Sequence, residues 1–263
     1  MFFPGGVIWL IIMRMNLPRF YCREAMAPGA HIELPEPVAR HAIRVLRLPP
    51  GAPIVLFDGR GGEYEGRIER IDRDRVIAAL GAWHDVERES PLEVTLVQAV
   101  QAGEKMDLTV QKAVELGVTQ IFPVASRRSV TRLAGERAAR RVAHWQGVAA
   151  AACEQCGRNQ VPQVAPLEKL EFWLARPAGN GLRLVLAPDA GQSLVDLAPA
   201  ERVQLLVGAE GGLDPQEILA AGQVGFQAVG LGPRILRTET AGLAALAAMQ
   251  ALWGDFRGRS AHV

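Results

Sequence analysis

The pattern of apolar and polar positions divides the chain into two parts with different rhythms. Between about residues 17 and 83, short apolar runs are separated by turns that contain Gly and Asp. This spacing predicts β-strands at residues 20–21, 54–57, 64–71 and 76–80. One helix is predicted within this part, over residues 37–48, because two prolines precede a helical pattern. The first part therefore predicts a small, strongly bent sheet or barrel.

The predicted helix over residues 37–48 is amphipathic. Its apolar residues fall on one face of a helical wheel and its arginines on the opposite face. The two sets are Val38, Ala42, Val45 and Leu46, and Arg40, Arg44 and Arg47. We expect the arginine row to face solvent.

The second part follows a polar segment at residues 84–91, which predicts a linker between domains. Strands and helices then alternate. Strands are predicted at residues 92–100, 120–124, 182–186, 203–207 and 228–231, and helices at residues 105–116, 136–156, 215–221 and 240–252. Because each strand is nearly all apolar, the pattern predicts an α/β domain with a parallel sheet covered on both faces.

The amino-acid composition argues against some classes of protein, among them nucleic-acid coating proteins and secreted disulfide-rich proteins. The 263 residues are 49% hydrophobic, which is sufficient for one large domain or two modest ones. A net charge of +1 argues against a protein that coats nucleic acid by bulk charge, so any nucleic-acid site must be a local patch. Three cysteines are too few for a secreted disulfide framework and favour a reducing, cytoplasmic setting.

The N-terminal segment is expected to lie outside the fold. Its apolar run, residues 7–13, is too short to span a membrane and lacks the basic flank of a signal peptide. No other stretch approaches the length of a membrane span, so no membrane association is expected. The predicted organisation is a dispensable extension at residues 1–14, a first domain at 15–86 and a second at 87–257.

A glycine-rich loop follows the predicted strand at residues 203–207. It contains VGAEGGL at residues 207–213, and Asp214, Pro215 and Glu217 then form a helix start with a capping box. Such a turn lets backbone amides approach a ligand closely, although it can equally be a tight turn without one. The pattern is neither a dinucleotide fingerprint nor a phosphate-binding P-loop.

A second loop, LGPRILRTETA at residues 231–241, follows the next strand and enters the last helix. Arg234 and Arg237 lie beside a glycine and helix-start hydroxyls, which fits an anion or backbone site. The same loop can also be a capped turn whose arginines face solvent. Both loops leave the carboxyl ends of parallel strands, where open α/β sheets bind ligands.

Six arginines between residues 126 and 144 face a single acid, Glu136, which gives this stretch a net charge of +5. They are Arg127, Arg128, Arg132, Arg137, Arg140 and Arg141. The run matches the electrostatic footprint of a nucleic-acid backbone, or else it is a solvated helix face. Cys153 and Cys156 lie inside a predicted Ala-rich helix without a second ligand pair, so we expect small packing residues and no metal site.

Five motifs in this order resemble one family. They are HAIRVLR at residues 41–47, KAVELG at 112–117, ACEQCGR at 152–158, and the two glycine loops. Together they resemble the ribosomal RNA small subunit methyltransferase E family of the SPOUT superfamily, over about residues 17–254. One departure is Ala209, where the family usually has proline; the change loosens the turn but removes no side-chain chemistry.

The resemblance implies a SPOUT-type parallel-sheet domain with a deep trefoil knot, preceded by a PUA-like β-barrel that recognises RNA. It also implies a homodimer that binds S-adenosylmethionine in the knot. The implied reaction is methylation of N3 of uridine 1498 in 16S ribosomal RNA of the 30S subunit.

This resemblance places the cofactor against the two glycine loops and the end of the neighbouring strand. The expected cofactor contacts are Leu186, Ala187, Pro188, Gly208, Glu210, Gly211, Gly212, Leu231, Gly232, Ile235, Leu236, Arg237 and Thr240. Uracil N3 must lose its proton before it can attack a methyl group. Arg237 and Arg158 are candidates for the cation that stabilises the resulting anion, and Glu154 and Glu239 for the base.

The RNA contacts are expected on the basic positions of both parts. They are Arg19, Arg40, His41, Arg44, Arg47, Arg127, Arg128, Arg132, Arg137 and Arg141. Two other functions stay open at this point. One is a related knotted methyltransferase that acts on a ribose 2′-hydroxyl or another base. The other is an RNA-binding assembly factor without catalysis.

Overall fold

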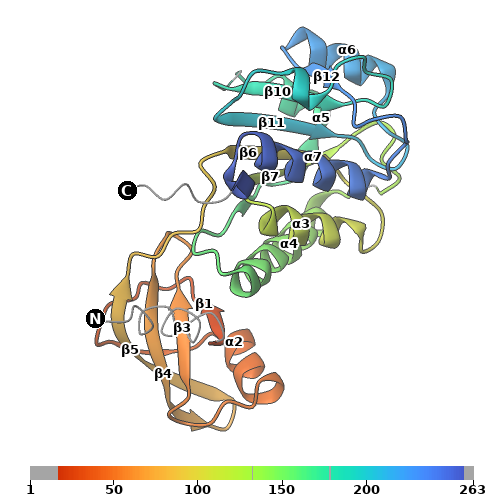
Figure 1. The fold of residues 1–263 in the computed structure, drawn as a ribbon. Helices are drawn as coiled ribbons and strands as arrows, with labels where there is room; N and C mark the ends of the chain where they lie inside the picture. Colours follow the sequence, from red (N-terminus) through yellow and green to blue (C-terminus); the bar gives the residue numbers. More distant parts are fainter. Residues whose placement is uncertain (1–16, 132, 178, 258–263) are drawn as a thin grey trace, which may run out of the picture. The chain divides into compact units, whose positions relative to one another are not determined.

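The computed structural model describes residues 17–131, 133–177 and 179–257, and Figure 1 shows its secondary structure. It divides into two compact units. The first contains the chain up to residue 89 together with residues 153–161, and the second contains residues 90–152 and the chain from residue 162. We expected one boundary, between residues 86 and 87. The extension at residues 1–14 and Arg132 lie outside the described residues.

The first unit is built on a five-stranded sheet in the order β1-β3-β4-β5-β2. Its strands are β1 (Arg19–Tyr21), β2 (His31–Glu33), β3 (Pro53–Phe57), β4 (Glu63–Asp72) and β5 (Arg75–His84). β1 pairs in parallel with β3, and the other neighbours are antiparallel. The predicted strands are confirmed. β2 was missed because three residues with one apolar side chain carry no alternation.

The helix of the first unit differs from the expected amphipathic helix. It consists of α2 (Glu36–Arg40) and a π-helical turn, η1 (His41–Val45). Val45 is 69% exposed and Leu46 41% exposed, so the predicted apolar face is wrong at both positions. The prediction is confirmed at Ala42, which is buried in the core, and at Val38, which packs against it; Ala39, which was not on the predicted face, is buried as well. The Leu46 amide donates to the His41 carbonyl at 3.0 Å, and this wider turn rotates later residues away from a 3.6-residue period.

The second unit contains a seven-stranded sheet in which every pairing is parallel. The strand order is β12-β10-β11-β6-β7-β8, and β9 also pairs with β7. The strands are β6 (Glu93–Ala99), β7 (Val118–Ala125), β8 (Gln163–Val164), β9 (Glu168–Lys169), β10 (Leu182–Leu186), β11 (Arg202–Val207) and β12 (Gln227–Val229). The predicted parallel sheet is therefore confirmed.

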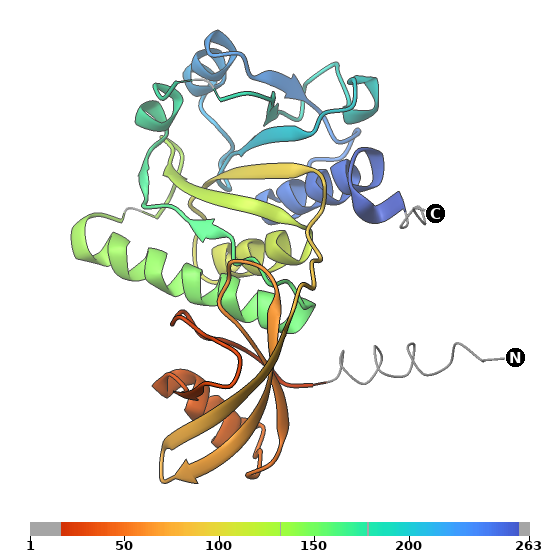
Figure 2. The same cartoon turned by 90° about the vertical axis from the view of Figure 1, so that its left-hand side faces the viewer.

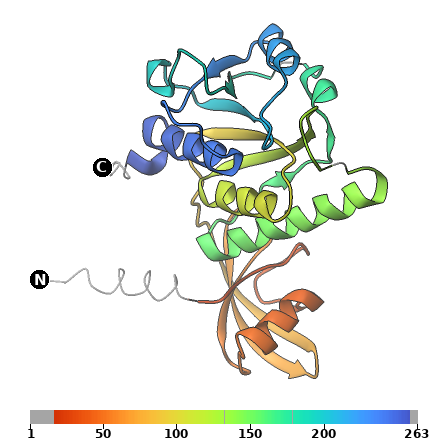
Figure 3. The same cartoon turned by 90° about the vertical axis from the view of Figure 1, so that its right-hand side faces the viewer.

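Helices cover both faces of this sheet. They are α3 (Lys105–Glu115), α4 (Gly135–Cys156), α5 (Leu170–Leu174), α6 (Pro215–Gln223) and α7 (Thr238–Leu252), with short 3₁₀ turns η2 (Leu194–Asp196) and η3 (Asp255–Arg257). Figures 2 and 3 show α7 on one face and α5 and α6 on the other. The α5 side contains Leu170 and Trp173, which pack against Leu206 and Val97 of the sheet. Among the described helices, none has the length and apolarity required to cross a bilayer.

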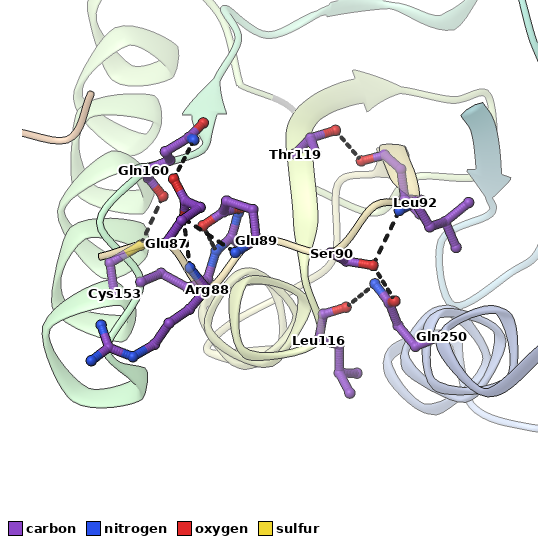
Figure 4. Close-up of polar contacts among 12 residues, drawn as sticks. Glu87, Arg88, Glu89, Ser90, Leu92, Leu116, Thr119, Cys153, Gln160 and Gln250 are labelled. Carbon is purple, nitrogen blue, oxygen red and sulfur yellow. Dashed lines mark hydrogen bonds and ion pairs between the residues drawn. The ribbon is translucent and has the colours of Figure 1, made fainter. Parts of the chain in front are cut away.

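One buried amide joins the end of α7 to the end of α3 and to the start of β6 (Figure 4). Gln250 is fully buried, and its Nε2 donates to the Leu116 carbonyl at 3.0 Å. Its Oε1 accepts from Ser90 Oγ at 2.7 Å, and the same hydroxyl oxygen accepts from the Leu92 amide at 3.2 Å. Gln250 thus satisfies half-buried polar groups at the edge of the core.

Replacing Gln250 with leucine is expected to lower the free energy of unfolding by about 2 kcal/mol or more. The substitution leaves the Leu116 carbonyl and the Ser90 hydroxyl without this partner, and each unsatisfied buried group costs about 1–3 kcal/mol. Urea titration measures the effect. Gln223→Leu, at an exposed position of α6, is the control and is expected to change stability by less than about 0.5 kcal/mol. Equal stability of the two variants would contradict the assigned role of Gln250.

Candidate functional site

A cavity of about 530 Å³ lies at the carboxyl ends of β10, β11 and β12. Most of its lining residues lie within the segments 186–189, 207–213 and 229–241, and each of these segments begins at the last residue of one of the strands. The two glycine loops thus meet at one cavity, as their sequence positions predicted. The volume lies within the range of small-molecule and cofactor sites.

The first glycine loop is held in a tight turn. The Gly212 amide donates to the Ala209 carbonyl at 2.8 Å, and Gly212 has a positive φ of 69°. A Cβ at Gly208 would lie 2.8 Å from both the Gly212 carbonyl carbon and the Leu213 amide nitrogen. Because both neighbours are backbone atoms, only glycine fits at position 208 in this conformation.

The helix that follows this loop begins as predicted. The Gln216 amide donates to Asp214 Oδ1 at 3.0 Å, and the Asp214 amide donates to Glu217 Oε2 at 2.9 Å. The second of these bonds, together with the bond from the Glu217 amide to the Asp214 side chain, forms the capping box of α6. The other oxygen of Glu217 accepts from the Arg127 amide at 2.8 Å. The capping box therefore also fixes the backbone that carries the first arginines of the basic run.

The second loop is bonded to the first through Thr238. The Thr238 hydroxyl donates to the Gly208 carbonyl, which also accepts from Gln98 Nε2 at 3.2 Å. The side-chain amide of Gln101 is oriented so that its nitrogen donates to Thr109 Oγ1. Its oxygen then accepts from the Glu239 backbone amide at 3.2 Å. α7 begins at Thr238, two residues earlier than predicted, so that Arg237 is its N-cap. These contacts hold the start of α7 against the first loop.

The cavity lining contains both signs of charge. Its cations are Lys105, Arg128, Arg234 and Arg237, and its acids are Asp189, Glu210 and Glu239. Lys105 Nζ lies 3.3 Å from Glu210 Oε1, and Arg128 Nη1 donates to the Gly211 carbonyl at 3.2 Å. Within the described chain, Arg237 has no ion-pair or side-chain hydrogen-bond partner. Its guanidinium is therefore available to a ligand.

Glu210 fixes the first loop to the start of α3. Its Oε1 accepts from the Ala102 amide at 3.0 Å as well as from Lys105. Burial acts to raise the pKa of Glu210, but the Ala102 amide and the Lys105 ammonium outweigh it and hold the pKa below its usual range. Glu210 is thus ionised at neutral pH and serves as an anchor of the loop.

Glu239 differs from Glu210 because one of its oxygens is unsatisfied. Glu239 Oε2 is buried and has no hydrogen-bond partner among the described residues. A buried carboxylate oxygen without a partner is costly, so it marks a position where a cationic or hydrogen-bond-donating ligand group is favoured. Since Glu239 lines the cavity, this one position of the lining favours a donor or a cationic group of a ligand.

The cofactor contacts predicted from the sequence lie at this cavity, with one exception. Thr240 is exposed on α7 and does not line the cavity. The sequence did not single out Lys105, Asp189 or Thr238, which do line it. Asp189 directly follows the predicted contact segment at residues 186–188, and Thr238 lies two residues before the predicted helix start. A wider margin around those two boundaries would have included both residues.

The four catalytic candidates separate into two pairs. Arg237 and Glu239 line the cavity of the second unit, whereas Arg158 and Glu154 belong to the first unit and do not line it. The Arg158 side chain is only 6% exposed and is paired with Glu89, with Nε 2.8 Å from Oε1. Glu154 Oε1 accepts from the Tyr21 amide at 2.8 Å. These contacts assign Arg158 and Glu154 structural roles and do not support their catalytic assignment.

The Arg19 side chain also makes structural contacts, with Glu63 and Asn159. Its side chain is 8% exposed, with Nη1 2.6 Å from Glu63 Oε2 and Nη2 2.5 Å from Asn159 Oδ1. The guanidinium also lies over the Phe57 ring. Burial acts to raise the pKa of Glu63, but Arg19 and Arg88 outweigh it and lower the pKa. The expectation that Arg19 contacts RNA phosphates is wrong for this conformation, because its charge is neutralised inside the unit.

The other predicted RNA contacts among the described residues lie at the surface, and several have acidic partners. Arg40 pairs with Glu36, and Arg44 pairs with Asp74 at 2.9 Å. His41, Arg47, Arg127, Arg128 and Arg137 are exposed, and Arg141 is half-buried. Arg141 Nη2 lies 3.5 Å from Asp107 Oδ1, and His144 Nε2 lies 2.7 Å from Asp107 Oδ2. Exposed pairs of this kind are weak enough to exchange for phosphates.

The cysteines show no sign of a redox or metal site. In the part of the chain that the structure describes, no three metal-ligating side chains form a cluster. Cys22 and Cys153 are buried, and burial raises the pKa of each thiol to about 12. At pH 8 the thiolate fraction is therefore about one in ten thousand, which makes both side chains poor nucleophiles.

Alkylation tests this assignment of the thiols. With iodoacetamide at pH 8, Cys22 and Cys153 are expected to react far more slowly in the native protein than in urea, because the reactive thiolate is suppressed and shielded. Peptide mass spectrometry gives the rate at each cysteine. Equal rates for Cys153 with and without urea would contradict its burial.

Comparisons with known proteins agree with this geometry. A sequence model described as the RNA methyltransferase domain matches residues 88–250, and one described as the RNA methyltransferase PUA domain matches residues 34–80. The ribosomal RNA small subunit methyltransferase E of Buchnera aphidicola (Schizaphis graminum) is 32% identical over 244 residues, which cover 92% of this chain and 99% of that protein. The chain belongs to the ribosomal RNA small subunit methyltransferase E family.

Solved structures of similar proteins include complexes with a cofactor. The ribosomal RNA small subunit methyltransferase E of Neisseria gonorrhoeae, bound to S-adenosylmethionine, is 45% identical with a TM-score of 0.88, and covers 92% of this chain and 100% of its own. A Legionella pneumophila protein with bound S-adenosylmethionine is 36% identical with a TM-score of 0.89 and the same coverage. Within the family fold, the PUA match of this chain lies in the first unit.

Proposed function

We propose that this family member transfers a methyl group from S-adenosylmethionine to N3 of a uridine in 16S ribosomal RNA of the 30S subunit, uridine 1498 by family resemblance. The observation that carries the proposal is the cavity formed by the two glycine loops. It contains two groups without a partner among the described residues, the Arg237 guanidinium and a buried carboxylate oxygen of Glu239. In methyl transfer to a uracil, the Arg237 guanidinium would stabilise negative charge on the base and Glu239 would accept a proton.

The lining fits S-adenosylmethionine. Backbone groups of residues 186–188, 208–212 and 231–236 would hold its adenine and amino-acid ends, and Glu239 lies where positive charge is favoured. Gly232, with a positive φ of 89° and no atom within 4 Å of a Cβ position, leaves room for close approach of a ligand. When bound, the cofactor supplies an activated methyl group.

Two side chains of this protein would act on the uracil that accepts the methyl group. Uracil N3 carries a proton at neutral pH and becomes nucleophilic only when that proton leaves. The Arg237 guanidinium would stabilise the negative charge that then develops on the uracil, as a fixed cation does at other oxyanion sites. Glu239 would accept the N3 proton in the same cavity.

The remaining family properties are part of the same proposal. The arginines that stay exposed after folding would contact RNA phosphates. The implied trefoil knot, the closed PUA-like barrel and the homodimer stay predictions. Their support is the family membership together with the parallel sheet and the five-stranded sheet.

Nucleoside analysis tests the proposed function. Unmodified 30S subunits are incubated with the chain and radiolabelled S-adenosylmethionine, and the ribosomal RNA is digested and chromatographed. Label is expected in 3-methyluridine. Label in a 2′-O-methylated nucleoside would instead identify a related methyltransferase, and calorimetric binding of the cofactor without any transfer would indicate an assembly factor.

A further inference from the structure

A second cavity lies in the same unit as the methyl-donor cavity but shares no lining residue with it. Its volume is about 480 Å³. It lies between the segment after β7, the segment that contains α5, and the first turns of α6. The residues that carry the argument are Ser126, Arg127, Ser129, Lys169, Leu170 and Ala220.

The two cavities lie on opposite sides of one wall. Arg128 lines the methyl-donor cavity, whereas its neighbour Arg127 lines the second cavity. α6 is divided in the same way, since Pro215 and Ile218 line the first cavity and Gln216 and Ala220 line the second. The wall is therefore about one helix thick, on the order of 10 Å with side chains. A short stretch of single-stranded RNA can cross such a wall.

The chemistry of the second cavity fits a nucleoside. Leu133 and Ala220, both half-buried, provide an apolar surface on which a base can rest, and the buried Leu170 lies behind them. The hydroxyl oxygens of Ser126 and Ser129 lie 2.9 Å apart and can bond ribose or base edges. Glu217 also lines the cavity, but both of its oxygens already accept backbone amides. The lining thus has apolar and hydroxyl character where a base and ribose would be held.

The charges indicate where the phosphate would lie. Lys169 is paired with Glu171 at 3.3 Å, and the two side chains are 65% and 62% exposed, so this pair adds little net charge at the rim of the second cavity. Arg127 and Arg128, at the wall, are 58% and 48% exposed at their side chains, and both lie near Asp214. A phosphodiester that crosses the wall would therefore meet two guanidinium groups.

We propose that the second cavity binds a nucleotide that neighbours the methylated uridine, with the phosphate between them held at Arg127 and Arg128. The proposal rests on the proposed function, because it requires an RNA acceptor in the first cavity. It assigns to the cavity a role in recognising the RNA strand around the target. The neighbouring nucleotide fixes the position of the target base, as stacked bases do at other single-strand sites.

Filling the second cavity tests the proposal. Ala220→Phe places a ring in the cavity, and Leu219→Phe is the matched control, because Leu219 is the adjacent α6 residue, is largely exposed and lines neither cavity. The KM for unmodified 30S subunits is expected to rise about tenfold for Ala220→Phe, the scale of one lost base contact. The affinity for S-adenosylmethionine, measured by calorimetry, is expected to stay unchanged in both variants.

Two results would overturn the proposal: an unchanged KM in folded Ala220→Phe, or a loss of cofactor affinity in that variant. If Ala220→Phe does not fold, Arg127→Ala tests the proposal in its place. It is expected to raise the KM for 30S subunits. It is also expected to lower, by about 1, the slope of log binding constant against log salt concentration for subunit binding. An unchanged slope would then reject the proposal. Failure of the parent chain to methylate uridine rejects the proposed function, whereas unchanged KM values in an active chain reject only the second site.

Discussion

Gly208→Ala is expected to weaken the binding of S-adenosylmethionine by about 10- to 100-fold. The added Cβ would meet the Gly212 carbonyl carbon and the Leu213 amide nitrogen at 2.8 Å, so the first glycine loop must move. Overpacking of this kind costs about 1–3 kcal/mol, and each 1.4 kcal/mol is tenfold in affinity. Because the Gly208 carbonyl also accepts from Thr238, the start of α7 moves with the loop. Calorimetry with the cofactor alone measures the effect.

Gly222→Ala is the control for this experiment. Gly222 lies in α6, and no atom lies within 4 Å of its Cβ position. Alanine is favoured over glycine inside a helix by about 0.5–1 kcal/mol, so this variant is expected to bind the cofactor normally and to be no less stable than the parent. Normal cofactor affinity in Gly208→Ala would show that the loop does not require glycine at this position.

Arg237→Ala is expected to lower kcat on 30S subunits by about 100- to 1000-fold, the typical cost of losing one preorganised group that stabilises a developing negative charge. Cofactor affinity is expected to fall far less than kcat, because Arg237 is only one of many expected cofactor contacts, whereas its proposed partner in the reaction is the uracil. Within the described residues the side chain has no protein partner, so its removal leaves no buried charge. Steady-state kinetics and calorimetry, done in parallel, separate the two effects.

Arg202→Ala is the matched control for Arg237→Ala. Arg202 begins β11 and pairs with Glu93 at an exposed position, at the opposite end of the strand from the cavity. Its variant is expected to keep both kcat and affinity. Arg237→Lys, which keeps the charge but not the planar fork, is expected to recover part of the activity. An unchanged kcat in Arg237→Ala would remove Arg237 from the chemistry.

The order of strands and helices was predictable because its signals are local. Apolar runs predicted β6, β7, β10 and β11, and Asp214 with Glu217 predicted the capped start of α6. The signals failed where elements are short or irregular. α5 has only five residues, and the π-helical turn at His41–Val45 changes the helical period that a wheel assumes.

Domain boundaries were harder to predict because they depend on long-range contacts. Residues 153–161 belong to the first unit, although residues 153–156 are the last turn of α4, whose earlier residues belong to the second. Arg158 pairs with Glu89, and Asn159 bonds Arg19 and the Val86 carbonyl. A linear scan of composition has no access to such pairs, and so it placed a single boundary at the polar linker.

By itself, the sequence determined the parallel α/β domain, the two glycine turns at strand ends and the family to which the chain belongs. These features depend on residue type, periodicity and spacing, which a linear sequence contains in full. The tertiary structure alone decided which charged residues remain available. Arg237 and Arg158 are equivalent cations in the sequence, but folding buries Arg158 against Glu89 and leaves Arg237 at the cavity without a partner among the described residues. Burial and ion pairing join residues far apart in the chain, and only the folded chain brings those residues together.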